Sequence, residues 1–270
     1  MPGPGVDGEA GRLRAESLRL AELERIKAQF LNLVAHELRG PLAVARGYTS
    51  MLLDGTYGPP SAVDLRAAGP VIAAKLEEMG QLVDQMIETA RLEDDQLHLN
   101  REVVDLREVV HAALRMMTPL VQRHQLLTRW LPGEVRVLGD RDRLLTILTN
   151  LLDNACKYSP PGTDVELTCG LEAGMATAAV ADHGFGIAAE DLPRLFTRFG
   201  RIVTRQNGHI PGTGLGLYLC RELARMHGGT LDATSEVDAG SVFTLRLPPW
   251  SPLGTQPPEP SVAMNSSGEM

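Results

Sequence analysis

The stretch Asn150-Leu-Leu-Asp-Asn154-Ala-Cys-Lys157-Tyr158 closes a segment of helical periodicity that begins at Arg141. Asn150 and Asn154 are four residues apart, so they lie on one face of a helix about one turn from each other. Amide oxygens can coordinate a hard cation such as Mg²⁺, and Lys157 supplies a positive charge suited to a phosphate. An ordinary polar helix face also carries such pairs, so the stretch predicts a phosphate site only together with the motifs after it.

Two glycine-rich motifs follow this stretch. The first, Asp182-His-Gly184-Phe-Gly186-Ile187, comes directly after the apolar segment 175–181, where a strand would end. The second, Gly212-Thr213-Gly214-Leu215-Gly216-Leu217, opens an apolar-periodic run. A glycine-rich loop that opens a helix allows close backbone approach and presents free N–H groups to an anion. Each motif alone is a turn about as often as a nucleotide site, but the three features in this order predict a nucleotide site.

In this order the motifs resemble the ATP-binding domain of two-component sensor histidine kinases, a branch of the superfamily that includes gyrase-type and chaperone-type ATPases. The resemblance implies an α/β sandwich, with a mixed sheet on one side and three helices on the other, that uses ATP and Mg²⁺. It implies that Asn154 holds Mg²⁺ with Asn150 beside it, and that Lys157 approaches the phosphates. Tyr158 would approach the base, and Asp182 would accept a hydrogen bond from the adenine amino group. The other residues expected at the nucleotide are Gly184, Gly186, Ile187, Phe196, Phe199, Gly212, Thr213, Gly214, Leu215, Gly216 and Leu217.

Two further features bear on the type of enzyme. Phe196 and Phe199 match the family's aromatic box at the root of the ATP lid, and the resemblance makes 200–211 that lid. Hydrolases of the superfamily carry a Glu where this chain has Asn150, because they must activate water. A carboxamide is a poor general base. Asn150 therefore favours transfer of the phosphoryl group to another acceptor over simple hydrolysis.

The acceptor is expected upstream, in Phe30-Leu-Asn-Leu-Val-Ala-His36-Glu37-Leu-Arg-Gly-Pro41-Leu, which resembles the phosphoacceptor box of the same kinases. At about 100° per residue, His36 falls more than about 100° from the centre of the helix's apolar stripe, on the polar face. An exposed His on a helix is usually only a surface residue, but a phosphoacceptor must also be exposed. The neighbouring Glu37 carboxylate can hold one imidazole nitrogen protonated while the other attacks. Pro41 removes an N–H and predicts a kink one turn beyond His36.

Two long helices are predicted at the N-terminal end, at 13–53 and 63–92, separated by the turn cluster 54–60. Two such helices cannot bury their apolar stripes alone, so a dimeric four-helix bundle is expected, followed by the α/β sandwich, in an α+β multidomain chain. The expected domains are a disordered stub (1–12), a dimerisation and phosphoacceptor hairpin (13–95), an ATP-binding domain (102–248) and a disordered tail (249–270). Within 102–248, helices are predicted at 106–123, 140–157 and 214–228, and strands at 102–105, 126–131, 134–138, 163–170, 175–182, 229–235 and 240–247.

Composition excludes several classes of protein. The net charge of −8 argues against a general nucleic-acid binder. The cysteines, Cys156, Cys169 and Cys220, are an odd and unclustered set, so neither a disulfide framework nor a metal site is expected. No run of 18 apolar residues and no signal peptide is present, so a cytoplasmic chain without a membrane span is expected. The sensor input is expected to be absent, removed, or supplied by a separate sensor protein.

The sequence therefore predicts a homodimeric histidine protein kinase that phosphorylates itself at His36 with help from Glu37 and passes the group to an Asp of a response regulator. Two alternatives stay open. One is a non-kinase ATPase of the same superfamily, against which Asn150 and the box around His36 argue. The other is a degenerate kinase that serves as a dimeric scaffold. Gly240-Ser-Val-Phe243 stands where relatives often show a Gly-Thr pair.

Overall fold

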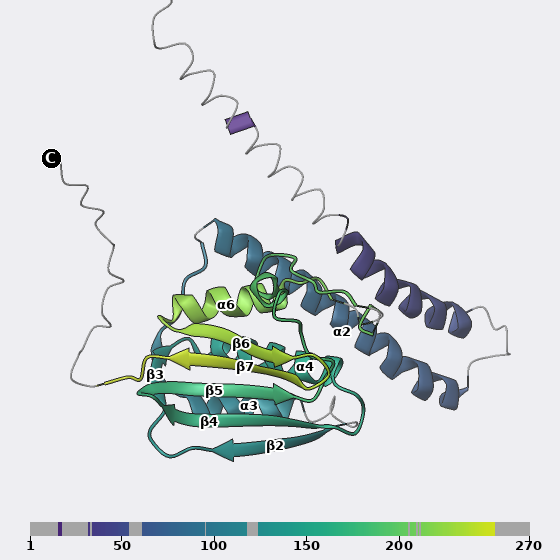
Figure 1. Ribbon diagram of the computed structural model, residues 1–270. Helices are drawn as coiled ribbons and strands as arrows, with labels where there is room; N and C mark the ends of the chain where they lie inside the picture. The colour runs from purple at the N-terminus through teal and green to yellow at the C-terminus, as the bar shows by residue number, and fades with distance from the viewer. Residues whose placement is uncertain are drawn as a thin grey trace, which may run out of the picture. The chain divides into compact units, whose positions relative to one another are not determined.

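The computed structural model of the 270-residue chain describes residues 16–17, 32, 34–53, 61–94, 96–117, 124–204, 206–208, 210 and 212–251. The chain divides into two compact units, which Figure 1 shows with the helices as coils and the strands as arrows. The first unit comprises residues 1–90 with 211–215, and the second comprises residues 91–210 with 216–270. Within the described part of the chain, no helix combines the length and the apolar character needed to cross a membrane.

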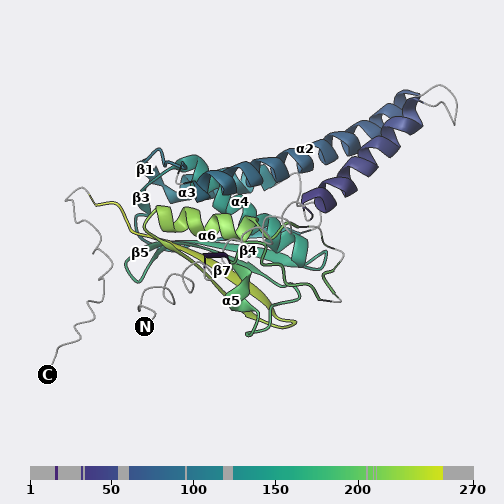
Figure 2. The same cartoon turned by 90° about the horizontal axis from the view of Figure 1, so that it is seen from above.

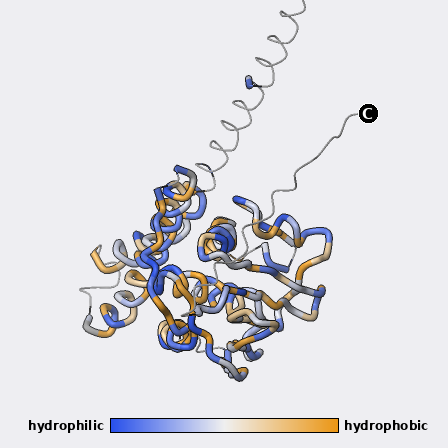
Figure 3. Tube along the Cα trace, turned by 90° about the vertical axis from the view of Figure 1, so that its left-hand side faces the viewer, coloured by the Kyte–Doolittle hydropathy of each residue, from blue (hydrophilic) through white to orange (hydrophobic). Residues whose placement is uncertain are grey.

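The first unit contains two long helices, as the apolar periodicity predicts. One spans 34–53 and the other, α2, spans Ala62–Glu93. The first part of the predicted helix, from residue 13 to residue 33, lies outside the described residues except for 16–17 and 32. The first helix continues through Pro41, and α2 contains Pro70, a proline that the sequence reasoning passed over. Figure 3 shows hydrophobic residues (orange) and hydrophilic residues (blue) alternating along the helical parts of the trace.

The second unit is an α/β sandwich. Its main sheet has five strands in the order β2-β4-β5-β7-β6, with β2 parallel to β4 and every other pair antiparallel. The predicted mixed sheet is thereby confirmed. A separate two-stranded antiparallel sheet pairs β1 with β3. The elements are β1 (Glu102–Asp105), α3 (Leu106–Met117), β2 (Gln125–Trp130), β3 (Arg136–Gly139), α4 (Arg141–Tyr158), β4 (Asp164–Glu172), β5 (Met175–Asp182), α5 (Leu192–Leu195), α6 (Gly216–Met226), β6 (Thr230–Glu236) and β7 (Gly240–Leu247).

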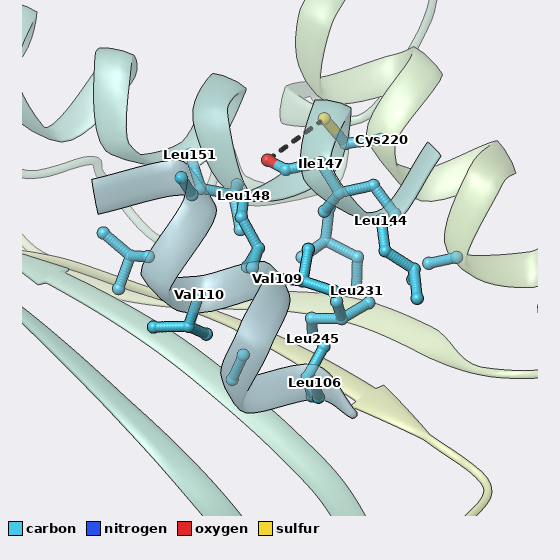
Figure 4. Packing of buried hydrophobic residues seen from close by; sticks show 14 of the residues in the cluster. Leu106, Val109, Val110, Leu144, Ile147, Leu148, Leu151, Cys220, Leu231 and Leu245 are labelled. Carbon is cyan, nitrogen blue, oxygen red and sulfur yellow. Dashed lines mark hydrogen bonds between the residues drawn. The ribbon is translucent and has the colours of Figure 1, made fainter. Parts of the chain in front are cut away.

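Three helices of this unit, α3, α4 and α6, lie on the same face of the five-stranded sheet (Figure 2). Their apolar faces meet the sheet in one core, in which each buried leucine stabilises the fold by about 1.5–3 kcal/mol. Figure 4 shows this packing, including the contact of the Cys220 thiol on α6 with the carbonyl oxygen of Ile147 on α4, at 3.9 Å. Fully buried members of the core include Leu106, Leu144, Ile147, Leu148, Leu151, Cys220 and Leu245.

The helix α4 is held firmly at its N-terminus. The Asp140 side chain caps it by accepting hydrogen bonds from the N–H groups of Asp142 and Arg143, both at 3.1 Å. The other carboxylate oxygen of Asp140 accepts from the N–H of Asn100, at 2.9 Å. The cap therefore fixes both the start of α4 and the chain segment that leads into this unit. This matters because α4 carries four of the predicted site residues.

Several boundaries differ by one or two residues from those predicted, and two of the differences have a clear physical reason. The helix α6 begins at Gly216 and not at Gly214, because Gly214 has φ +70°, a left-handed conformation that cannot continue into a right-handed helix. At the other end, Pro249 forms a bridge with Val137, and the Trp250 N–H donates to the carbonyl of Arg136. The packed chain therefore continues past residue 248, where the domain was expected to end. Residues 252–270 of the expected tail lie outside the described residues.

Candidate functional site

Asn150 and Asn154 lie on α4, as predicted, but their side chains differ in their surroundings. The Asn150 amide N–H donates to the carbonyl oxygen of Thr146, at 2.9 Å, which fixes the orientation of its side chain. The half-buried Asn154 side chain has no hydrogen-bond partner in the part of the chain that the structure describes. A neutral amide oxygen with free coordination capacity is a suitable ligand for Mg²⁺, so Asn154 fits the expected role.

Lys157 is engaged in an ion pair on the surface of α4. Its ammonium lies 2.6 Å from a carboxylate oxygen of Asp153, one turn earlier, and the two side chains are 47% and 38% exposed. An exposed pair at this spacing contributes only about 0.3–0.5 kcal/mol. The ammonium can therefore leave Asp153 for a stronger anion at little cost, and Lys157 stays a candidate for a phosphate contact.

Asp182, the last residue of β5, has a buried carboxylate and is 7% exposed. Its Oδ1 accepts a hydrogen bond from the N–H of Gly184, at 2.8 Å, and Ser241 is its cross-strand partner on β7. Burial raises the pKa of Asp182, and the backbone of Gly184 and of Ser241 partly offsets this shift. A buried carboxylate held by backbone groups is well placed to accept from the amino group of a base.

The glycines after Asp182 are required by close backbone contacts. A Cβ on Gly184 would lie 2.5 Å from the carbonyl oxygen of Tyr158, so the end of α4 and this loop touch directly. A Cβ on Gly186 would overlap the carbonyl oxygen of Glu236, and Gly186 has φ +65°. The structure thus brings Tyr158, Asp182, Gly184 and Gly186 together, as the sequence predicts, and Ile187 follows at the end of the same loop.

The aromatic residues of the predicted box pack separately. The ring of Phe196 meets that of Phe243 edge to face, with centroids 6.5 Å apart, and the Arg221 guanidinium lies 5.1 Å from the Phe196 centroid. The guanidinium of Arg198 lies 5.0 Å from the centroid of Phe199, which has φ +61°. Phe196 thereby joins the core of the sandwich, whereas Phe199 marks a strained turn where the chain leaves it.

The residues of the glycine-rich motif 212–217 are divided between the two units. In the second unit, Gly216 opens α6, and a Cβ on it would lie 2.9 Å from Oδ1 of Asn150, so a larger residue there would displace the Asn150 carboxamide. Leu217 follows and is half-buried. In the first unit, Thr213 is 3% exposed and its hydroxyl accepts from the N–H of Leu215, at 3.3 Å. A Cβ on Gly212 would meet nothing within 4 Å.

His36 and Glu37 lie in the first unit, on the helix 34–53. The His36 side chain is 77% exposed, and its Nδ1 lies 3.5 Å from Oε1 of Glu37, whose side chain is 6% exposed. The predicted exposure of His36 is found, and so is the predicted closeness of the carboxylate to one ring nitrogen. If His36 is the phosphoacceptor, this arrangement would leave the other ring nitrogen, Nε2, as the nucleophile.

Sequence reasoning missed two groups of residues around the site. Ser235 and Ser241 form a hydroxyl pair. The sequence drew attention to Gly240-Ser241 only by resemblance, and it gave no sign of Ser235, whose bond to Ile187 spans 48 residues. His227 is 6% exposed, and its Nε2 accepts from the N–H of Asp140. The sequence gave one sign of this contact: Asp140 stands directly before the predicted helix, where a capping residue is expected.

Comparison with protein families matches two parts of the chain. Residues 26–95 match the His Kinase A (phospho-acceptor) domain, and residues 139–251 match the histidine kinase-, DNA gyrase B- and HSP90-like ATPases. The sensor protein SrrB of Staphylococcus aureus is 32% identical over 232 residues, which cover 84% of this chain and 39% of SrrB. The chain thus spans about two fifths of the length of the curated relatives that it matches.

Two solved structures are also similar. The histidine kinase AdeS of Acinetobacter baumannii has a TM-score of 0.58 and 26% identity, covering 79% of this chain and 97% of AdeS. The full-length protein ShkA, solved in complex with AMPPNP, has a TM-score of 0.57 and 25% identity, covering 82% of this chain and 45% of ShkA.

Proposed function

Because this chain belongs to the two-component sensor histidine kinases, we propose that it is an ATP-dependent protein-histidine kinase. In this proposal the γ-phosphoryl group of ATP passes to His36 and then to an Asp of a separate response regulator. The observation that carries it is the exposed His36 imidazole with the Glu37 carboxylate 3.5 Å from its Nδ1.

The Glu37 carboxylate holds the proton on Nδ1, so the Nε2 lone pair is the nucleophile. A bond forms between Nε2 and the γ-phosphorus, and the bond from that phosphorus to its bridging oxygen breaks, so ADP leaves. The positive charge that develops on the ring is stabilised by the neighbouring carboxylate. A further transfer to an Asp carboxylate would return His36 to its neutral form.

The nucleotide site would be formed by the α4 face and the loop after β5. Asp182 would accept from the adenine amino group, with Gly184, Gly186 and Ile187 against the base. Mg²⁺, when bound, would neutralise phosphate charge, and Asn154 is the residue that we propose to hold it. Asn150, a carboxamide held by Thr146, lacks the basicity to activate water, which favours transfer over hydrolysis.

We also propose that the hairpin 13–95 forms a homodimer and that 102–248, together with the packed residues Pro249 and Trp250, is the ATP-binding domain. Several apolar side chains of α2 are exposed in the single chain, among them Leu65, Leu76, Val83 and Ile87, at 42–56%. At about 100° per residue these four positions fall within about 40° of one another, on one face. A long exposed apolar stripe on a helical hairpin is best explained by a second hairpin that covers it.

The match of residues 26–95 to the phospho-acceptor domain supports a kinase over the two alternatives, a non-kinase ATPase and a degenerate scaffold. The test is incubation of the full chain with γ-labelled ATP. A kinase acquires protein-bound label that is labile in acid and stable in base, as a phosphohistidine is. Phosphate release without labelled protein would favour the ATPase, and neither label nor release would favour the scaffold.

A further inference from the structure

The hydroxyl of Ser235, on β6, takes part in three hydrogen bonds, which occupy its hydrogen and both of its lone pairs. Its oxygen accepts from the N–H of Ile187 at 2.8 Å, and its hydrogen donates to the carbonyl of Gly240 at 2.8 Å. The Ser241 hydroxyl lies 2.9 Å away. A hydroxyl has one hydrogen and two lone pairs, so with its hydrogen on Gly240, Ser235 accepts from Ser241 as well.

This hydroxyl belongs to a row of residues that crosses three strands. Ser235 on β6 is the cross-strand partner of Ser241 on β7, and Ser241 is the partner of Asp182 on β5. The row therefore connects Ser235 to Asp182, where the Asp182–Ile187 loop begins. The hydrogen bond from the N–H of Ile187 to Ser235 holds the other end of the same loop.

Two more contacts fasten the loop to the turn between β6 and β7. The N–H of Asp238 donates to the carbonyl of Phe185, at 2.8 Å. Gly186 packs so closely on the carbonyl of Glu236 that no Cβ fits between them. Of these attachments, the bond from Ile187 to Ser235 is made by a side chain, so a single substitution can remove it while the backbone stays intact.

We propose that Ser235 is a positioning residue of the nucleotide site: its hydroxyl fixes the Asp182–Ile187 loop in the conformation that presents the Asp182 carboxylate to a purine base. The proposal rests on the proposed function, since it assumes that this loop binds ATP. Ser235 does not itself contact the nucleotide. Its effect is on how well the site distinguishes adenine, which offers an amino donor to Asp182, from guanine, which offers a carbonyl acceptor at that position.

The test uses the full chain with Ser235→Ala, and the dissociation constants of ATP and GTP measured by calorimetry. We expect Ser235→Ala to weaken ATP binding about tenfold, which corresponds to about 1.4 kcal/mol, and to bring the ATP and GTP constants closer together. Ser235→Thr keeps the hydroxyl and should restore most of the affinity. Thr234→Ala, which removes an exposed hydroxyl from the adjacent position of β6, should bind like the native chain.

The ratio of the two constants separates positioning from a merely structural role. A variant that is only less stable has fewer folded molecules, which lowers the apparent affinity for both nucleotides by the same factor. An unchanged ratio in Ser235→Ala, or unchanged ATP affinity, overturns the proposal. If Ser235→Ala does not fold, Ser241→Ala removes one hydrogen bond of the set and should give a smaller change of the ratio in the same direction; no change there overturns the proposal too. A native chain that binds neither nucleotide would instead refute the proposed function.

Discussion

The imidazole of His227, which follows α6, accepts a hydrogen bond at Nε2 from the backbone N–H of Asp140, which precedes α4, at 3.0 Å. Its Nδ1 lies 2.7 Å from the carbonyl oxygen of Leu223 and must therefore carry the hydrogen. The ring is thus neutral and in one tautomer. Burial lowers the pKa of His227; the Leu223 carbonyl and the Asp140 carboxylate oppose this shift, and Arg101 adds to it.

This arrangement predicts a pH-dependent stability. The unfolded chain takes up a proton on this His near pH 6.5, whereas the folded chain does so only at lower pH. The free energy of unfolding is therefore highest above about pH 6.5 and falls as the pH decreases, until the folded pKa is reached. Thermal melts between about pH 7.5 and 5.5 should show this fall, and His227→Gln should show a smaller one. Equal slopes in the two proteins would contradict the assignment.

His36→Gln should abolish labelling by γ-labelled ATP and leave ATP affinity unchanged, because the substitution removes the nucleophile and nothing from the nucleotide site. Glu37→Gln should slow labelling, because a neutral amide stabilises the developing imidazolium less. His98→Gln is a matched control, since His98 is also exposed, and it should label like the native chain. Label that persists on His36→Gln would refute the phosphoacceptor assignment.

Asp182→Asn should weaken ATP binding at least tenfold, because a hydrogen bond to a charged group is worth about 1.5–3 kcal/mol. The pKa of Asp182 is raised by burial, so ATP affinity should be full at neutral pH and fall as the pH drops through this raised pKa, above the ordinary value of 3.8. Calorimetry across this range should show the fall in the native chain and not in Asp182→Asn.

Asn154→Ala should weaken the dependence of ATP binding on Mg²⁺ concentration.

Gly40→Thr should speed the decay of a phosphorylated regulator mixed with this protein and ADP. A hydroxyl one helical turn after His36 would be placed to orient an attacking water, and Gly40 offers no such group. The added side chain has room, since a Cβ there would meet nothing within 4 Å. Gly40→Ala is the control without a hydroxyl. Rapid decay already with the native chain would show that the missing hydroxyl does not matter.

Leu76→Asp should dissociate the proposed homodimer, because it places a charge in the apolar stripe of α2, where Leu76 is 56% exposed in the single chain. Ala74→Asp is the matched control, because residue 74 is exposed and lies about 180° around the helix from Leu65. Sedimentation at micromolar concentration should give a dimer for the native chain and Ala74→Asp, and a monomer for Leu76→Asp. A monomeric native chain would refute the dimer.

The long periodic elements could be predicted from the sequence because burial imposes their pattern. The helix predicted at 140–157 is α4, Arg141–Tyr158, and the strand predicted at 175–182 is β5, Met175–Asp182. The short helix α5, Leu192–Leu195, was missed because one helical turn has too few residues to show a period.

The site was predictable to the extent that its residues share local motifs. Asp182 and the glycines after it stand in one such motif, and the structure shows the contacts that require them. Ser235 could not be found in this way, because its partner Ile187 is 48 residues away and only the pairing of the strands brings them together. His227 was missed for the same reason, since Asp140 is 87 residues away.

The glycines around Asp182 have a consequence for protein engineering. A side chain on Gly184, Gly186 or Gly240 would collide with the backbone of Tyr158, Glu236 or Asp182, so these three positions leave no volume in which a new contact could be built. Redesign of the base preference must therefore proceed through Asp182 itself or through the side chains that hold its loop. Libraries that randomise the glycines would consist mostly of misfolded variants, whereas at Ser235 and Ser241 a substitution removes a side-chain hydrogen bond without adding a collision with the backbone.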